Sequence, residues 1–265
     1  MLSENLARVR ARIQQACQRC GRDPASVTLV CVTKGIASEA IQEAVSLGVT
    51  DLGENRVQEA RAKQLVLGSR LEAGGQGLEP QASSLQPIRW HLIGHLQRNK
   101  ARDAVELFNV IHSVDSQTLA EKLECQAEKR ARGSGLGVRG GSPHPSTLNP
   151  ERNLEVFLQV NASGEATKFG CTPAEAPSLA QAIGRLPHLR LVGLMTMAPF
   201  VEHPEHARPY FRQLRLLREE LLHSSLITHD SSLLLSMGMS NDFEVAIEEG
   251  ADFVRIGSAI FKDSD

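Results

Sequence analysis

The stretch Val27–Ile36 reads VTLVCVTKGI, and it sets the pattern that the rest of the chain repeats. Residues 27–33 are mostly β-branched or aliphatic, which is typical of a strand buried on both faces. The strand ends at Lys34, and the spacing of an amphipathic helix follows from Ser38 to Leu47. A buried strand followed by such a helix is the repeating unit of folds built around a parallel sheet.

Seven further segments carry the same strand signal, and all but the last are followed by a helical pattern. The predicted strands cover residues 49–53, 88–93, 110–114, 154–160, 189–195, 233–236 and 252–256. The predicted helices between them cover residues 55–67, 99–107, 116–132, 172–185, 204–223 and 242–249. Parallel strands joined by right-handed crossovers close into a barrel, and 265 residues is a usual length for one. The sequence therefore predicts an α/β fold with a single (β/α)8 TIM barrel.

Three segments lie outside this alternation. Residues 1–20 predict an extra N-terminal helix, because apolar residues recur there at helical spacing. Two stretches rich in glycine and serine, 68–87 and 133–150, predict mobile surface loops within one barrel domain of residues 1–265. The rival architecture is an open doubly wound sheet, whose first turn would carry G-x-G-x-x-G; the turn here reads VTKGIAS.

Composition narrows the partners. The chain has 29 basic and 31 acidic residues and a formal charge of −2, which gives no sign of a nucleic-acid partner. No apolar stretch is long enough to span a membrane, and the first 20 residues lack a signal-peptide core. We expect a cytoplasmic protein without membrane association, and a monomer, since no heptad seam is evident. The cysteines are an odd and scattered set that predicts free thiols: Cys17, Cys20, Cys31, Cys125 and Cys171.

Polar residues follow nearly every predicted strand, at the end where barrel active sites form. Lys34 ends the first strand, SMGMS ends the seventh, and Gly257 with Ser258 follows the eighth. Backbone N–H groups at the start of a helical turn, with a small hydroxyl, suit a phosphate. Because a lysine amine and an aldehyde form a Schiff base, this layout fits an aldehyde-bearing phosphate cofactor, of which pyridoxal phosphate (PLP) is the common case.

Seven motifs carry a family resemblance, and they run in order over nearly all of residues 27–261. They read VCVTKG, LGENRVQE, WHLIGHLQRNK, IHSVDS, VFLQVNASGEATKFG, LVGLMTMAP and LSMGMSNDFEVAIEEGADFVRIGSAIF. Together they resemble the pyridoxal phosphate homeostasis proteins. The resemblance implies a barrel like the N-terminal domain of alanine racemase, which is fold type III among PLP proteins.

The resemblance also implies a set of cofactor-binding residues. Lys34 is expected to hold PLP as a Schiff base, Arg255 to face the pyridine nitrogen, and Asn55 to lie beside the cofactor. The phosphate is expected to bind the residues that follow strands seven and eight: Met239, Ser240, Gly257 and Ser258.

The sequence departs from the family pattern at two places. The family usually has Ser-Lys-Thr-x-Pro around the lysine, whereas this chain has Thr33-Lys34-Gly35 without the proline. After the last motif the family typically has glycine where this chain has Lys262. The first departure leaves the turn after the lysine unexplained.

Two other functions are alternatives to PLP binding and homeostasis. An amino-acid racemase on the same barrel needs a second base opposite the lysine, but the one tyrosine, Tyr210, lies in a helical pattern and is expected to pack. A metal hydrolase would use a histidine pair such as His203 and His206, but no carboxylate cluster accompanies it, so no metal is expected. His91 is expected to line the pocket. We therefore expect no catalysis, and we expect PLP and apo forms of PLP-dependent enzymes as partners.

Overall fold

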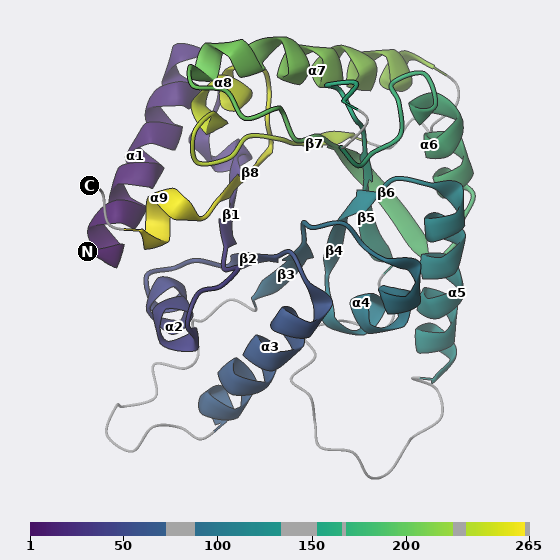
Figure 1. Cartoon of the computed structure of the whole chain (residues 1–265), viewed down its shortest axis with the longest axis horizontal. Coiled ribbons are helices and arrows are strands. Elements are labelled where there is room, and N and C mark those ends of the chain that lie inside the picture. The colour runs from purple at the N-terminus through teal and green to yellow at the C-terminus, as the bar shows by residue number, and fades with distance from the viewer. Residues whose placement is uncertain (73–87, 134–152, 166–167, 225–231, 263–265) are drawn as a thin grey trace.

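A computed structural model describes residues 1–72, 88–133, 153–165, 168–224 and 232–262, with 68–72 described by their backbone alone. Eight strands pair in parallel and close into a barrel in sequence order (Figure 1). They are β1 (Thr28–Val32), β2 (Asp51–Glu54), β3 (Arg89–Leu92), β4 (Val110–Val114), β5 (Leu154–Gln159), β6 (Leu189–Met195), β7 (Leu234–Ser236) and β8 (Phe253–Ile256). The predicted (β/α)8 barrel is confirmed.

The helices form a ring outside the barrel (Figure 1). They are α1 (Leu2–Arg19), α2 (Ser38–Ser46), α3 (Val57–Glu72), α4 (Ala101–Leu107), α5 (Gln117–Gly133), α6 (Ala176–Gly184), α7 (Arg208–His223), α8 (Phe243–Glu248) and the short α9 (Ser258–Phe261). Three 3-10 turns, η1 (Pro24–Ser26), η2 (Arg98–Lys100) and η3 (Pro204–Ala207), precede strands or helices. Helix α3 runs five residues beyond its predicted end. The rest of the two predicted loops, 73–87 and 134–150, lies outside the described residues.

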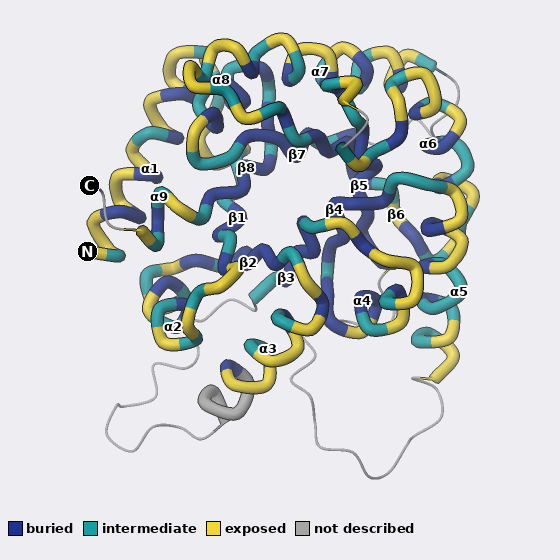
Figure 2. The backbone as a smooth tube through the Cα atoms, viewed as in Figure 1, coloured by how far each residue is buried: buried dark blue, intermediate teal, exposed yellow. Residues whose placement is uncertain are grey.

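Two apolar layers hold the fold together. The outer layer lies between the strands and the helices, whose outward faces are exposed (Figure 2). The inner layer fills the barrel and consists of Val30, Val110, Phe157, Val192, Met195 and Phe253. Burial of each such side chain stabilises the fold by about 1.5–3 kcal/mol. The interior is unusual because it also encloses polar side chains, which are described below.

The predicted N-terminal helix α1 covers the seam where β8 closes on β1. Its apolar face is buried against α8 and α9. Asn5 is buried in this contact, and its Nδ2 donates to Ile260 O and to Lys262 O, both at 3.2 Å. Arg12 forms an ion pair with Glu244 at 2.9 Å. Helix α1 therefore fixes the position of α9, which directly follows the last strand.

The structure also bears on the predicted free cysteines and on the expectation that no segment spans a membrane. All five cysteines are free, as predicted. No helix in the described parts of the chain is long and apolar enough to cross a membrane.

Candidate functional site

Lys34 lies on a tight turn at the carboxyl end of β1. Ile36 N–H donates to Thr33 O at 2.9 Å, which closes a four-residue turn. Gly35 is the third residue of this turn and has a φ of +69°, as a type II turn requires. The Lys34 side chain is exposed and has no hydrogen bond or ion pair with any described residue. The positive φ of this turn thus explains the glycine at position 35, where the sequence departs from the family pattern. The lysine amine is free to react.

Gly35→Ala is expected to destabilise the protein by about 1 kcal/mol, because a non-glycine residue is strained at positive φ. No atom lies within 4 Å of the added Cβ, so the cost is confined to the backbone. Urea unfolding measures the change. Gly184→Ala is the matched control, since that position is also open but does not have a positive φ. Equal stability of the two variants would show that the turn does not need glycine.

A buried ion pair anchors this turn. Thr33 Oγ1 lies 2.5 Å from Glu54 Oε1, and Lys63 Nζ of α3 lies 2.5 Å from the same oxygen. Lys63 Nζ also donates to Thr33 O at 2.6 Å. Glu54 is fully buried, and its Oε2 has no hydrogen-bond partner among the described residues. The sequence pattern alone did not predict this ion pair. The feature that could have indicated it is the carboxylate of Glu54 at the end of a short buried strand.

Asn55 lies beside the lysine turn, at the carboxyl end of β2. Strands β1 and β2 are neighbours, and Thr33 N–H donates to Gly53 O at 2.9 Å. The Asn55 backbone is held from the other side by Gly94, where a Cβ would lie only 2.3 Å from Asn55 O. The Asn55 amide has no hydrogen bond within the described residues and is therefore available to a ligand.

The loop after β7 returns to the same end of the barrel. Gly238 has a φ of +91°, and a Cβ there would lie 2.6 Å from Ala246 Cβ, so the loop packs tightly against α8. Met239 N–H donates to Asp242 Oδ1 at 2.6 Å, so this N–H is not available to an anion. Ser240 Oγ accepts from Ala259 N–H at 3.4 Å, which joins the loop to α9. The Ser240 N–H has no acceptor among the described residues.

Gly257 and Ser258 follow β8 and lie against the end of β1. The register pairs Cys31 with Ile256, and a Cβ on Gly257 would lie 3.0 Å from Val32 O. The Gly257 N–H has no acceptor among the described residues. The lysine turn and the start of α9 are therefore immediate neighbours. Together with Ser240, they offer N–H and hydroxyl groups beside a free amine.

Arg255 supplies a buried cation to this end of the barrel. Its Nη1 donates to Ser236 Oγ at 2.7 Å and its Nη2 donates to Thr196 O at 2.9 Å. Burial lowers the pKa of Arg255 to about 10, so the guanidinium remains charged at neutral pH. Arg255 forms no ion pair with Asp252 or Glu248, two carboxylates close in sequence with which an arginine here could pair. Both carboxylates pair with other arginines.

Other residues that the sequence singled out lie elsewhere. The expectation that His91 lines the pocket is wrong, because His91 is fully buried inside the barrel. Tyr210 packs against the outer apolar layer, as expected. His95 lies 3.5 Å from Asp115 and stacks on Phe169 in a groove after β3 and β4. No group of three metal-binding side chains occurs among the described residues.

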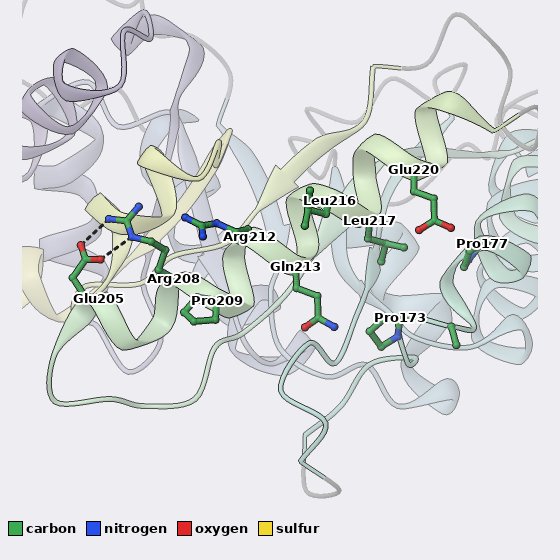
Figure 3. Close-up of a pocket in the computed structure, with 11 residues that line it drawn as sticks. Pro173, Pro177, Glu205, Arg208, Pro209, Arg212, Gln213, Leu216, Leu217 and Glu220 are labelled. Carbon is green, nitrogen blue, oxygen red and sulfur yellow. Dashed lines mark hydrogen bonds and ion pairs between the residues drawn. The ribbon is translucent and has the colours of Figure 1, made fainter.

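A larger groove of about 740 Å³ lies outside the barrel, between α6 and α7 (Figure 3). Its apolar wall includes Pro173, Pro177 and Leu217, and an ion pair of 2.7 Å between Glu205 and Arg208 borders it. None of the seven predicted cofactor residues lines this groove. The candidate site is therefore the barrel mouth, where those seven residues occupy the ends of β1, β2, β7 and β8.

Comparison with known proteins agrees with this geometry. A family model described as the alanine racemase N-terminal domain matches residues 5–265, which defines the class of barrel. A pyridoxal phosphate homeostasis protein of Pseudomonas aeruginosa is 41% identical over 261 residues, covering 98% of this chain and 94% of the relative. One of Aquifex aeolicus is 37% identical over 262 residues, covering 97% and 96%. The chain belongs to the family of the pyridoxal phosphate homeostasis proteins.

Solved structures give the same result. PipY of Synechococcus elongatus with PLP bound is 32% identical with a TM-score of 0.72, covering 98% of this chain and all of PipY. A protein of Bifidobacterium adolescentis is 37% identical with a TM-score of 0.80, covering 98% and 94%. An alanine racemase of Clostridium difficile is 14% identical with a TM-score of 0.64, covering 99% of this chain and 59% of the racemase, and shows the shared fold alone.

Proposed function

We propose that this protein binds PLP at the carboxyl end of its barrel and serves PLP homeostasis rather than catalysis. The observation that carries the proposal is the free, exposed amine of Lys34 beside the donors at the start of α9. The names of the relatives and the PLP bound to PipY support it.

Lys34 is the residue that we expect to hold the cofactor. Its Nζ bonds to the aldehyde carbon of PLP as a Schiff base, and the aldehyde oxygen leaves as water. The other groups of the barrel mouth bind and orient. We assign Arg255, which Ser236 and Thr196 hold in place, to the pyridine side of the site, as the family resemblance implies. Asn55 would lie beside the cofactor, since its amide has no hydrogen-bond partner among the described residues.

The phosphate site is proposed at the junction of the two loops. The N–H groups of Ser240 and Gly257 have no acceptor in the described parts of the chain, and Ser258 adds a hydroxyl at the first turn of α9. Such donors suit a dianion, as does the charge of Arg255. Met239 lies in the same loop, but because its N–H binds Asp242, we assign it a shaping role.

The carrier function is favoured over the racemase function by the position of the single tyrosine. Tyr210 lies on α7 and packs into the outer layer, where it cannot serve as a second base opposite Lys34. An unprotonated pyridine nitrogen facing a guanidinium is a weak electron sink, which slows carbanion chemistry without forbidding it. We propose apo PLP-dependent enzymes as recipients, and a cytoplasmic monomer with reduced thiols as the working form.

Transfer of the cofactor tests the carrier function. The PLP-loaded protein is mixed with an apo PLP-dependent enzyme, together with a phosphatase that destroys free PLP. Enzyme activity is expected to recover in the mixture, and to recover far less when free PLP replaces the loaded protein. Equal loss of recovery in both mixtures would rule out direct transfer. In a parallel assay, formation of D-alanine from L-alanine at about 1 per second or faster would instead favour the racemase.

A further inference from the structure

A chain of hydrogen-bonded side chains crosses the interior of the barrel. It runs from Arg255 Nη1 to Ser236 Oγ (2.7 Å), from Ser236 Oγ to His112 Nδ1 (2.8 Å), from His112 Nε2 to His91 Nδ1 (2.9 Å) and from His91 Nε2 to Asp51 Oδ1 (2.9 Å). All five side chains are buried, and they belong to β8, β7, β4, β3 and β2. The chain joins the barrel mouth to the amino-terminal end of β2.

The two ends of the chain differ in what they can do. Arg255 carries only donors, and Asp51, when ionised, carries only acceptors. Burial alone would raise the pKa of Asp51, but the hydrogen bonds of His91 and Thr50 and the charge of Arg89 hold it below its usual value. Thr50 Oγ1 lies 2.7 Å from the other oxygen, Asp51 Oδ2, and Arg89 lies 4.0 Å from Oδ1.

The two histidines between these ends are neutral. Burial lowers the pKa of His91 and lowers that of His112 further. The charged groups that act on them besides the chain ends are Arg89 and Glu155, which form an ion pair of 2.6 Å. The ring of His112 stacks on Phe157 with centroids 4.4 Å apart. Each ring therefore has one N–H and one lone pair to place.

Because Asp51 only accepts and each neutral ring has one N–H, every hydrogen bond in the chain can have only one assignment of donor and acceptor. Since Asp51 accepts, His91 must carry its proton on Nε2 and accept at Nδ1. His112 must then donate from Nε2 and accept at Nδ1, so the Ser236 hydroxyl points at His112. The lone pairs of Ser236 Oγ are left to receive Arg255. The carboxylate thus determines a tautomer at each histidine and, through them, the orientation of the hydroxyl that holds the guanidinium.

We propose that Asp51 is a positioning residue for the candidate cofactor site. From the opposite end of the barrel, Asp51 fixes the position of Arg255 through His91, His112 and Ser236. Its effect on the cofactor rests on the proposed function, but the direction of the chain does not.

Imidazole ¹⁵N NMR of the cofactor-free protein tests the direction. Both His91 and His112 are expected as neutral Nε2–H tautomers at about pH 7 to 8, because burial lowers the pKa of each ring. A proton on Nδ1 of either ring, or an imidazolium signal in this range, would overturn the proposal. This result does not depend on whether PLP binds.

Asp51→Asn tests whether the carboxylate sets the direction. An asparagine can donate as well as accept, so the chain loses its fixed end while the volume is kept. A population of the Nδ1–H tautomer is expected at His112, two hydrogen bonds away. Thr50→Val is the matched control, because it removes a hydrogen bond to the same carboxylate but leaves its charge. An unchanged His112 tautomer in Asp51→Asn, or equal changes in both variants, would contradict the proposal.

His112→Phe tests the link to the cofactor. It keeps a ring on Phe157 but removes two hydrogen bonds, so PLP is expected to dissociate about tenfold faster, as judged by stopped-flow loss of its visible band. Val110→Ala is the control, since it opens the same interior without touching the chain, and should change the rate less than about twofold. Equal rates in the two variants would remove the chain from cofactor retention, whereas no visible band in the wild-type protein would count against the proposed function instead.

Discussion

Lys34→Ala is expected to abolish covalent retention of PLP: after borohydride reduction, the wild-type protein should carry one pyridoxyl group on Lys34 and the variant none. The reason is that the Lys34 amine has no partner among the described residues and lies at the mouth of the barrel. Because the side chain is exposed, the free energy of unfolding should change by less than about 0.5 kcal/mol. Mass spectrometry of tryptic peptides measures the adduct.

The control for this variant is an exposed lysine far from the barrel mouth. Lys122 lies on the outside of α5, so Lys122→Ala should retain the full adduct at Lys34. A stoichiometric adduct that persists in Lys34→Ala would show that another lysine holds the cofactor. Complete retention of colour in that variant would contradict the assignment in the same way.

Gly94→Ala is expected to destabilise the protein more than Gly35→Ala does. The added Cβ would lie 2.3 Å from Asn55 O and 2.7 Å from Asn55 Cα, and backbone atoms cannot move aside as a flexible side chain can. Overpacking of this kind costs about 3 kcal/mol. Urea unfolding should show that loss, and PLP retention should fall as well, because Asn55 is displaced from the barrel mouth.

Gly184→Ala separates the steric effect from the general cost of replacing glycine. A Cβ at Gly184 meets no atom within 4 Å, so the free energy of unfolding of this variant should equal the wild-type value or exceed it by up to about 1 kcal/mol. If Gly94→Ala were equally benign, strands β2 and β3 would have to separate easily at their carboxyl ends. The close approach of Asn55 and Gly94 would then not be what positions Asn55.

The barrel could be predicted because each of its units is local. The strand and the helix in each unit differ in the period of their apolar residues, and that period is read within about 15 residues. Boundaries were less predictable. Helix α6 begins at Ala176 and not at residue 172, and the residues before it form a capping turn in which Thr172 and Glu175 accept from each other's N–H groups.

The site could be predicted in part, for the same reason. Lys34, Gly257 and Ser258 stand at strand ends, and a parallel barrel brings all such ends to one face. The interior chain could not be predicted, because its contacts join positions far apart, such as His112 and Ser236, which are 124 residues apart. The sequences of strands β3 and β4 do not indicate which side chains lie opposite theirs across the barrel.

The contact between Asn5 and α9 has a consequence for how the protein matures. The acceptor at Ile260 is made 255 residues after Asn5, so the ribosome releases almost the whole barrel before that contact can form. The cofactor residues after β8 are synthesised at the same late stage. A nascent chain therefore contains Lys34 long before it contains Gly257 and Ser258. We expect the ability to bind PLP to arise in one late step, when α1 packs against α9 and the barrel closes.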